Sequence, residues 1–199
     1  MTLKDLKNIH KDKTCNIIGC GTSVKNINKY NFGTNDIIIA LYHTIHLIER
    51  LELNIPVYSL QKDGGIKYSI YEDRFNAKCP DCSLCWERMT TPKNALLLST
   101  FDCLPHYDNR IIFNILELKS ENTFSGETAI LLSDLMGCNH INMIGFDSHF
   151  NKYDTLIIDK EMNIIEKTYD ISKSYYMDSN NKISEILKNK SHNWIYLEG

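Results

Sequence analysis

The chain has 199 residues, of which 43% are hydrophobic and 24% charged, and its formal net charge is −3. These proportions fit one soluble globular domain with a full core, and the lack of a basic excess argues against a broad nucleic-acid surface. No apolar run approaches the ~18 residues that span a bilayer, and the charged start lacks a signal-peptide core. We therefore expect a cytoplasmic protein without a membrane span.

The first part of the chain alternates polar turns with short apolar runs. Residues 1–13 predict a polar arm or short helix. The run Thr14–Ile18 then predicts a strand, which ends in the glycine turn Gly19–Ser23. The continuous apolar run Asp36–Leu41 predicts a second strand that is buried on both faces.

The alternation continues to the end of the chain and is interrupted once, by a polar, cysteine-bearing insert over residues 66–93. Strands are expected at residues 56–60, 94–99, 110–115 and 141–144, helices at residues 43–53, 126–136 and 181–189, a hairpin at residues 155–159 and 163–167, and a last apolar run at residues 194–197. This pattern predicts one α/β domain over residues 1–199, with a Rossmann-like, mainly parallel sheet and helices on both faces.

Two segments place glycines and hydroxyls at expected strand ends. In Gly19–Ser23 the glycines let the backbone come close to a ligand, and a following helix start offers N–H groups to an anion. Ser125 is expected to cap the helix that begins at Gly126, Gly145 to allow close approach at a strand end, and Asp147 to project from the rim. Because the carboxyl ends of parallel strands share one edge, both segments are expected to face the same site. The alternative is a plain turn and an ordinary helix cap.

These residues resemble a known family. Ile17–Val24, followed by Asp36–Ala40, looks like the opening of the bacterial sialyltransferases of glycosyltransferase family 42. A related Rossmann-like group, which includes a hydroxymethylpterin pyrophosphokinase, opens in a similar way. Ser125–Ala129 with Gly137–Asp147 is similar to the second signature of the family. The match fades over residues 54–115.

The resemblance implies a nucleotide at the strand ends, which is the cytidine monophosphate of an activated sugar in the sialyltransferases. It implies a glycosyltransferase that uses a nucleotide sugar as donor, without a metal, and transfers the sugar to an acceptor hydroxyl. The residues placed against the nucleotide are Gly19, Cys20, Gly21, Ser23, Ser125, Gly126, Gly145, Phe146 and Asp147.

The chain departs from the family pattern at several motif positions. Thr22 stands where the family has proline, and Cys20 where it has asparagine. A second asparagine would fall at about Tyr42 or His43. These departures put the transfer chemistry in more doubt than the nucleotide site.

The family's basic histidine has its counterpart at Asp178, which would activate the acceptor hydroxyl. His149 and His43 are the other candidate bases, although a histidine near a strand end is more often polar surface. Tyr176, or its neighbour Tyr175, would assist the departing phosphate, although adjacent tyrosines more often pack or form interfaces.

The insert carries Cys79, Cys82 and Cys85 at spacings that let three thiolates converge on one ion. Cys103 or His106 would complete a structural zinc site, and an iron–sulfur cluster is a less favoured alternative. The competing interpretation is three free thiols in a reducing compartment.

Two further functions remain open. The chain could be a nucleotide-binding module without transfer chemistry. It could also be a magnesium-dependent phosphotransferase of the pyrophosphokinase type, with Asp63, Asp102 and Asp147 as the available acids. The sequence leaves open the acceptor and homo-oligomerisation.

Overall fold

The computed structural model describes residues 1–62, 92–100, 107–119, 124–158, 163–168 and 173–199. The cysteines predicted to bind metal, Cys79, Cys82, Cys85 and Cys103, lie outside these ranges, as does His106.

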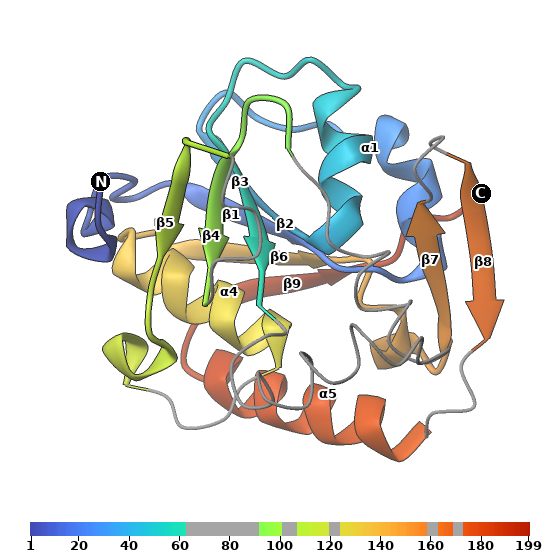
Figure 1. Cartoon of the computed structure of the whole chain (residues 1–199). Helices are drawn as coiled ribbons and strands as arrows, with labels where there is room; N and C mark the ends of the chain where they lie inside the picture. Colours follow the sequence, from blue (N-terminus) through green and yellow to red (C-terminus); the bar gives the residue numbers. More distant parts are fainter. Residues whose placement is uncertain (63–91, 101–106, 120–123, 159–162, 169–172) are drawn as a thin grey trace, which may run out of the picture.

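A seven-stranded parallel sheet forms the centre of the molecule (Figure 1), with the strand order β5-β4-β3-β2-β1-β6-β9. This confirms the predicted α/β fold. The strands are β1 (Thr14–Ile18), β2 (Asp36–Leu41), β3 (Val57–Gln61), β4 (Leu96–Ser99), β5 (Arg110–Ile112), β6 (His140–Ile144) and β9 (Ser191–Ile195).

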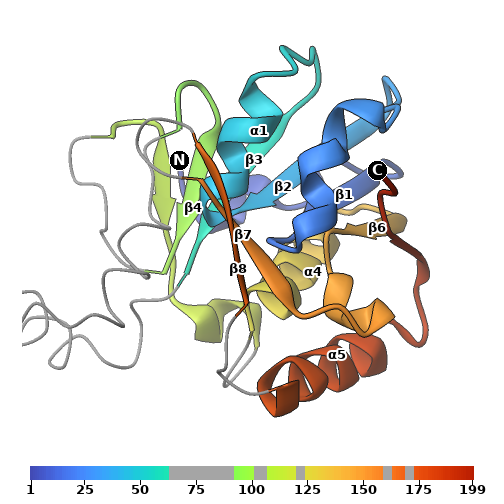
Figure 2. The ribbon, with the colours of Figure 1, turned by 90° about the vertical axis from the view of Figure 1, so that its right-hand side faces the viewer.

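Helices cover both faces of the sheet, as the continuous apolar strands require. Along β2, Ile37 and Ile39 point into one core cluster and Ile38 into the other. The first cluster packs against α4 (Ser125–Leu135), α5 (Lys173–Leu187) and the 3-10 turn η1 (Leu3–Leu6). The second packs against α1 (Ile45–Glu49) and the 3-10 segment η2 (Thr22–Lys29). Figure 2 shows the two layers on opposite sides of the sheet.

Two predicted helices have different bounds in the structure. The helix expected over residues 43–53 is shorter at both ends: the 3-10 turn η3 (Tyr42–Thr44) precedes α1, and α1 ends at Glu49, ahead of Glu52 with its positive φ of 49°. The helix expected over residues 181–189 begins earlier, at Lys173. Its first two turns carry Tyr175, Tyr176 and Met177 in succession and lack the helical apolar spacing from which the helix was predicted.

The strand order changes direction beside β1. From β1 the chain moves outward through β2, β3, β4 and β5, and then returns to place β6 on the other side of β1. Connections that leave neighbouring strands in opposite directions open a crevice at their carboxyl ends, which is where open α/β sheets bind ligands. Gly19–Gly21 follows β1 at this point, and Gly145–Asp147 follows β6.

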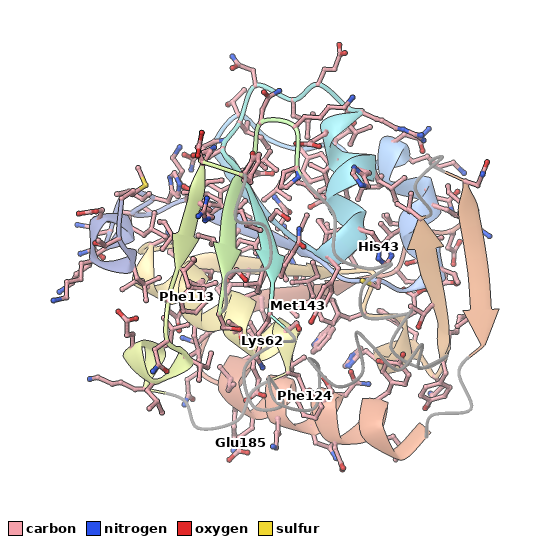
Figure 3. All side chains as sticks on the ribbon, in the orientation of Figure 1. His43, Lys62, Phe113, Phe124, Met143 and Glu185 are labelled. Carbon is pink, nitrogen blue, oxygen red and sulfur yellow. The ribbon has the colours of Figure 1, made fainter. Side chains whose placement is uncertain are left out.

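β7 (Asp154–Ile158) and β8 (Ile164–Thr168) form the antiparallel hairpin that the sequence predicted. The structure adds that this hairpin packs against the same end of the sheet. The Leu156 amide donates a 2.7 Å hydrogen bond to the Cys20 carbonyl, and Thr155 forms a β-bridge with Gly21. The imidazole of His43, labelled beside β7 in Figure 3, bonds through Nε2 to the Leu156 carbonyl at 2.7 Å. The hairpin is therefore fixed to the glycine turn that follows β1.

Candidate functional site

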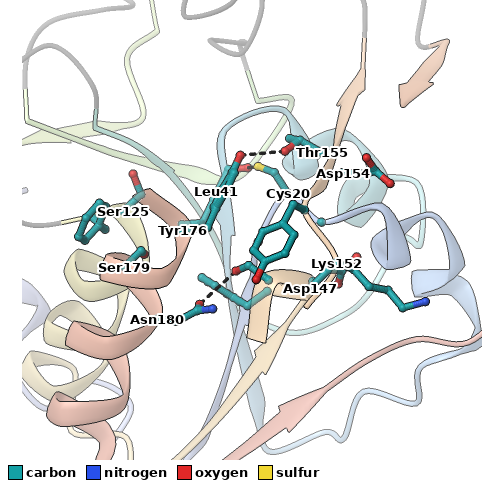
Figure 4. Close-up of a pocket in the computed structure, with 18 of the residues that line it drawn as sticks. Cys20, Leu41, Ser125, Asp147, Lys152, Asp154, Thr155, Tyr176, Ser179 and Asn180 are labelled. Atoms are coloured by element: carbon teal, nitrogen blue, oxygen red, sulfur yellow. Dashed lines mark hydrogen bonds between the residues drawn. The ribbon is translucent and has the colours of Figure 1, made fainter. Parts of the chain in front are cut away.

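A pocket of about 170 Å³ opens at the carboxyl ends of β1 and β6, between the β7–β8 hairpin and the start of α4 (Figure 4). It lies at the crevice that the strand order defines. Its described lining residues are Gly19, Cys20, Gly21, Leu41, Tyr42, Phe124, Ser125, Gly126, Gly145, Phe146, Asp147, Ser148, Lys152, Tyr153, Asp154, Thr155, Tyr176, Ser179 and Asn180. The pocket therefore brings together eight of the nine residues predicted to bind a nucleotide, and the ninth, Ser23, lies behind it.

The glycines allow the two strand-end loops to approach each other. The Gly19 amide donates to the Ile144 carbonyl at 2.7 Å, and the Gly21 amide donates to the Gly145 carbonyl at 2.8 Å. A Cβ at Gly19 would lie 2.6 Å from the Gly145 oxygen. The sequence predicted close approach to a ligand at these positions. The structure adds a second constraint, because the loops also interlock backbone to backbone.

Asp147 lines the pocket but does not project from its rim as expected. The side chain is 2% exposed, and its carboxylate accepts hydrogen bonds from the Ser23 amide at 2.7 Å and the Ser23 hydroxyl at 2.5 Å. Burial raises the pKa of Asp147, and the hydrogen bonds from Ser23 oppose this shift. Asp147 therefore anchors the start of η2, and a Cβ at Gly21 would collide with it.

Ser125 is the first residue of α4, and the N-cap residue is Phe124. The predicted cap is therefore displaced by one residue. The Phe124 amide donates to the Glu127 carboxylate at 2.8 Å, which leaves the Ser125 hydroxyl for a different contact. Ser125 Oγ lies 2.6 Å from Tyr42 Oη, so two hydroxyls meet at the pocket wall. Both lie at the N-terminus of an eleven-residue helix, whose dipole favours negative charge.

The opposite wall comes from β7 and α5. Tyr176 Oη lies 3.0 Å from Thr155 Oγ1, and the Ser148 hydroxyl donates to the Asn180 side-chain oxygen at 3.1 Å. Figure 4 shows both contacts bridging elements that are far apart in the sequence. Lys152 supplies a cation at the rim. The predicted role of Tyr176 beside a phosphate is compatible with this position.

The other predicted bases lie outside the described pocket lining. Asp178 is exposed on α5, although its neighbours Ser179 and Asn180 line the pocket. The His149 ring stacks on Trp194 with centroids 4.0 Å apart, and burial lowers its pKa. His43 is fully buried against β7.

Asp154, at the start of β7, is an exposed acidic residue among those that line the pocket. It was not among the predicted site residues. Its position depends on how the hairpin folds back over the glycine turn, and no local pattern in the sequence indicates this.

Within the described ranges, no group of three or more histidine, cysteine or acidic side chains could hold a metal ion. This finding tests neither the predicted zinc site nor the free-thiol alternative, since Cys79, Cys82, Cys85 and Cys103 lie outside the described ranges. In the same part of the chain, no helix combines the length and apolar character needed to cross a membrane.

Comparison with models of known protein families, with curated proteins and with solved structures found no match. The fold and the pocket geometry therefore stand on the structure alone. The resemblance to the sialyltransferases rests on the quoted motifs.

Proposed function

We propose that the protein is a glycosyltransferase that binds a nucleotide sugar in the pocket between β1 and β6 and transfers the sugar to an acceptor hydroxyl. The observation that carries the proposal is the position of the pocket. It lies where the strand order reverses, which is the place where α/β sheets of this class bind nucleotides.

The pocket lining supports a phosphate-bearing ligand. Ser125 and Tyr42 present hydroxyls at the start of α4, where helix N–H groups and the helix dipole favour an anion. Lys152 adds a positive charge at the rim. The rings of Tyr153 and Tyr176 supply flat apolar surface on the hairpin side, which suits a base or a ribose.

The proposed transfer uses Asp154 and Tyr176. The acceptor oxygen forms a bond to the anomeric carbon of the donor sugar, while the bond from that carbon to the phosphate oxygen breaks. The acceptor proton passes to the Asp154 carboxylate, and the Tyr176 hydroxyl donates a hydrogen bond to the departing phosphate. Asp154 replaces Asp178 in this role, since Asp178 does not line the pocket.

A second candidate is a nucleotide-binding module without transfer activity. The specific observation in its favour is that the three candidate bases named from the sequence, Asp178, His149 and His43, all lie outside the described lining of the pocket.

Thermal shift with nucleoside monophosphates, diphosphates and nucleotide sugars tests both candidates. We expect a rise in Tm with one base type, and about tenfold weaker binding in S125A from the loss of one hydrogen bond to a charged ligand. Release of free nucleotide from the donor should fall by at least about a hundredfold in D154N, while nucleotide binding remains. D178N is the matched control and should keep wild-type turnover.

Each remaining outcome has a defined meaning. No shift with any nucleotide contradicts both candidates. Binding without release of nucleotide from any donor favours the module. Loss of turnover in D178N but not in D154N overturns the assignment of the base. Magnesium-dependent consumption of ATP would favour the phosphotransferase alternative.

A further inference from the structure

Five aromatic side chains form a connected cluster beside the pocket. His149 stacks flat on Trp194, with ring centroids 4.0 Å apart and an interplanar angle of 3°. Phe146 meets Trp194 edge-on at 6.2 Å, and Phe150 lies 5.5 Å from Tyr196. His149 and Phe150 join the two halves, with centroids 5.2 Å apart. We call this cluster the aromatic platform.

Part of the platform is exposed to solvent. Phe150 is 37% exposed, and His149 is also exposed, whereas Trp194 and Tyr196 are partly covered. A single exposed ring is ordinary. Here the ring contacts hold each side chain in place, so a ligand would meet a surface that is already ordered and would lose less entropy on binding.

The platform is continuous with the pocket. Phe146 belongs to both, and Lys152 lines the pocket while its Nζ lies 4.9 Å from the centroid of the Tyr196 ring. The connecting loop begins at the end of β6 with the 3-10 turn η5 (Asp147–Phe150). It then reverses at Asn151, whose φ is 60°, and this turn returns Lys152 to the pocket. One short loop therefore contributes residues to both surfaces, and β9 with the residue after it adds Trp194 and Tyr196 to the platform.

We propose that the aromatic platform binds a sugar ring of a saccharide and serves as the acceptor subsite for the transfer described above. The assignment of an acceptor role rests on the proposed function. A pyranose presents a C–H face that packs on an aromatic ring and hydroxyls that need hydrogen-bond partners. The platform offers Phe150 and Tyr196 for the face, and His149 and Lys152 for the hydroxyls.

The mixture of groups favours a saccharide over a protein partner. The rings in contact with the exposed Phe150 are those of His149 and Tyr196, and both of these rings carry polar atoms. Partial burial and the nearby His192 lower the pKa of His149, which favours the neutral imidazole, and a neutral imidazole can both donate and accept a hydrogen bond. That pairing suits a sugar hydroxyl.

Saccharide titration monitored by saturation-transfer NMR and tryptophan fluorescence tests the proposal. The probes are lactose, N-acetyllactosamine and N,N′-diacetylchitobiose. Trp194 is one of two tryptophans in the chain, and W194F identifies its share of the signal. We expect at least one probe to bind, and F150A and Y196A each to weaken it by about tenfold. L116A removes a large side chain that is 62% exposed on a different element, η4 (Ile115–Leu118), and should leave binding unchanged.

The rise in Tm that nucleotide produces in F150A separates this proposal from the proposed function. This rise should equal that of the wild type, because Phe150 does not line the nucleotide pocket. Saccharide binding without any nucleotide response would contradict the transferase and leave the platform as a sugar site. Absence of binding by all three probes would overturn the platform, as would equal loss in L116A. A dimer in size-exclusion chromatography that F150A converts to a monomer would identify a self-association face instead.

Discussion

At the scale of single residues, the site depends on how closely two strand-end loops approach each other. Gly145 has a φ of 73°, and a Cβ there would collide with Val24. Gly21 leaves room for the carboxylate of Asp147, which in turn holds the Ser23 amide and hydroxyl. The pocket floor is therefore a fixed surface, and its geometry is set before any ligand arrives.

The pKa of Asp147 gives a prediction with a definite sign. Burial raises this pKa above the ordinary value of 3.8, so the folded protein holds the proton more tightly than the unfolded chain does. The contribution of Asp147 to stability therefore grows as the pH falls through its folded pKa, and levels off below 3.8. D147N does not titrate, so the unfolding free energy of the wild type relative to D147N should rise on acidification.

Urea denaturation of both proteins between neutral pH and the ordinary aspartate pKa measures this difference. D147A is the second variant. It leaves the buried Ser23 amide without its acceptor and should cost about 2 kcal/mol at neutral pH. A difference between wild type and D147N that stays flat or falls on acidification would show that the carboxyl is not held in a raised-pKa environment.

At the scale of elements, the β7–β8 hairpin is the part that turns a sheet edge into a pocket. Leu156 and Ile158 of β7 are buried in the core beside η2 and α1, while the side chain of Thr155 faces Tyr176. The hairpin thus ties the glycine turn after β1 to α5, two elements that are distant in the chain.

We predict that L156A destabilises the protein by about 3 kcal/mol, because a fully buried leucine loses its packing and leaves a cavity. The same variant should weaken nucleotide binding, since Asp154 and Thr155 precede it on the strand. I164A on β8 is the control, because Ile164 is 43% exposed, and it should change stability by less than about 0.5 kcal/mol. Denaturant unfolding measures both. Equal losses in the two variants would mean that the hairpin is not held through β7.

At the scale of the whole molecule, local patterns in the sequence predicted six of the seven strands of the sheet; β9 begins at Ser191, before the apolar run expected at residues 194–197. The bounds of β1 and β2 match the predicted strands, because a continuous apolar run between polar turns has few alternatives in a parallel sheet. The sequence also predicted that Gly19–Ser23 and Gly145–Asp147 lie at one edge of the sheet, because the carboxyl ends of parallel strands share that edge. The positive φ of Glu52, which lies within the range of the expected helix, has no such signal, since a glutamate rarely adopts that conformation.

The chemistry of the site was harder to predict than its position. Ser125, Gly145 and Tyr176 lie at the pocket as expected, whereas Asp178 was chosen by its place in a motif and is exposed on the neighbouring face of α5. Asp178 follows the pocket-lining Tyr176 by two residues, and along a helix two residues turn a side chain by about half a turn, so Asp178 points away from the pocket. Asp154 reaches the pocket through the hairpin fold, which depends on tertiary contacts between β7 and the glycine turn.

Hydrogen–deuterium exchange with saturating nucleotide tests the central claim, that the pocket between β1 and β6 is a nucleotide site. The nucleotide used is the one that gives the largest thermal shift. We predict slower exchange in the segments around Gly19–Gly21, Ser125–Gly126, Gly145–Ser148, Tyr153–Thr155 and Tyr176–Asn180, which are separate in the sequence and meet at the pocket. Protection confined to other segments, or no protection at saturation, would contradict the account.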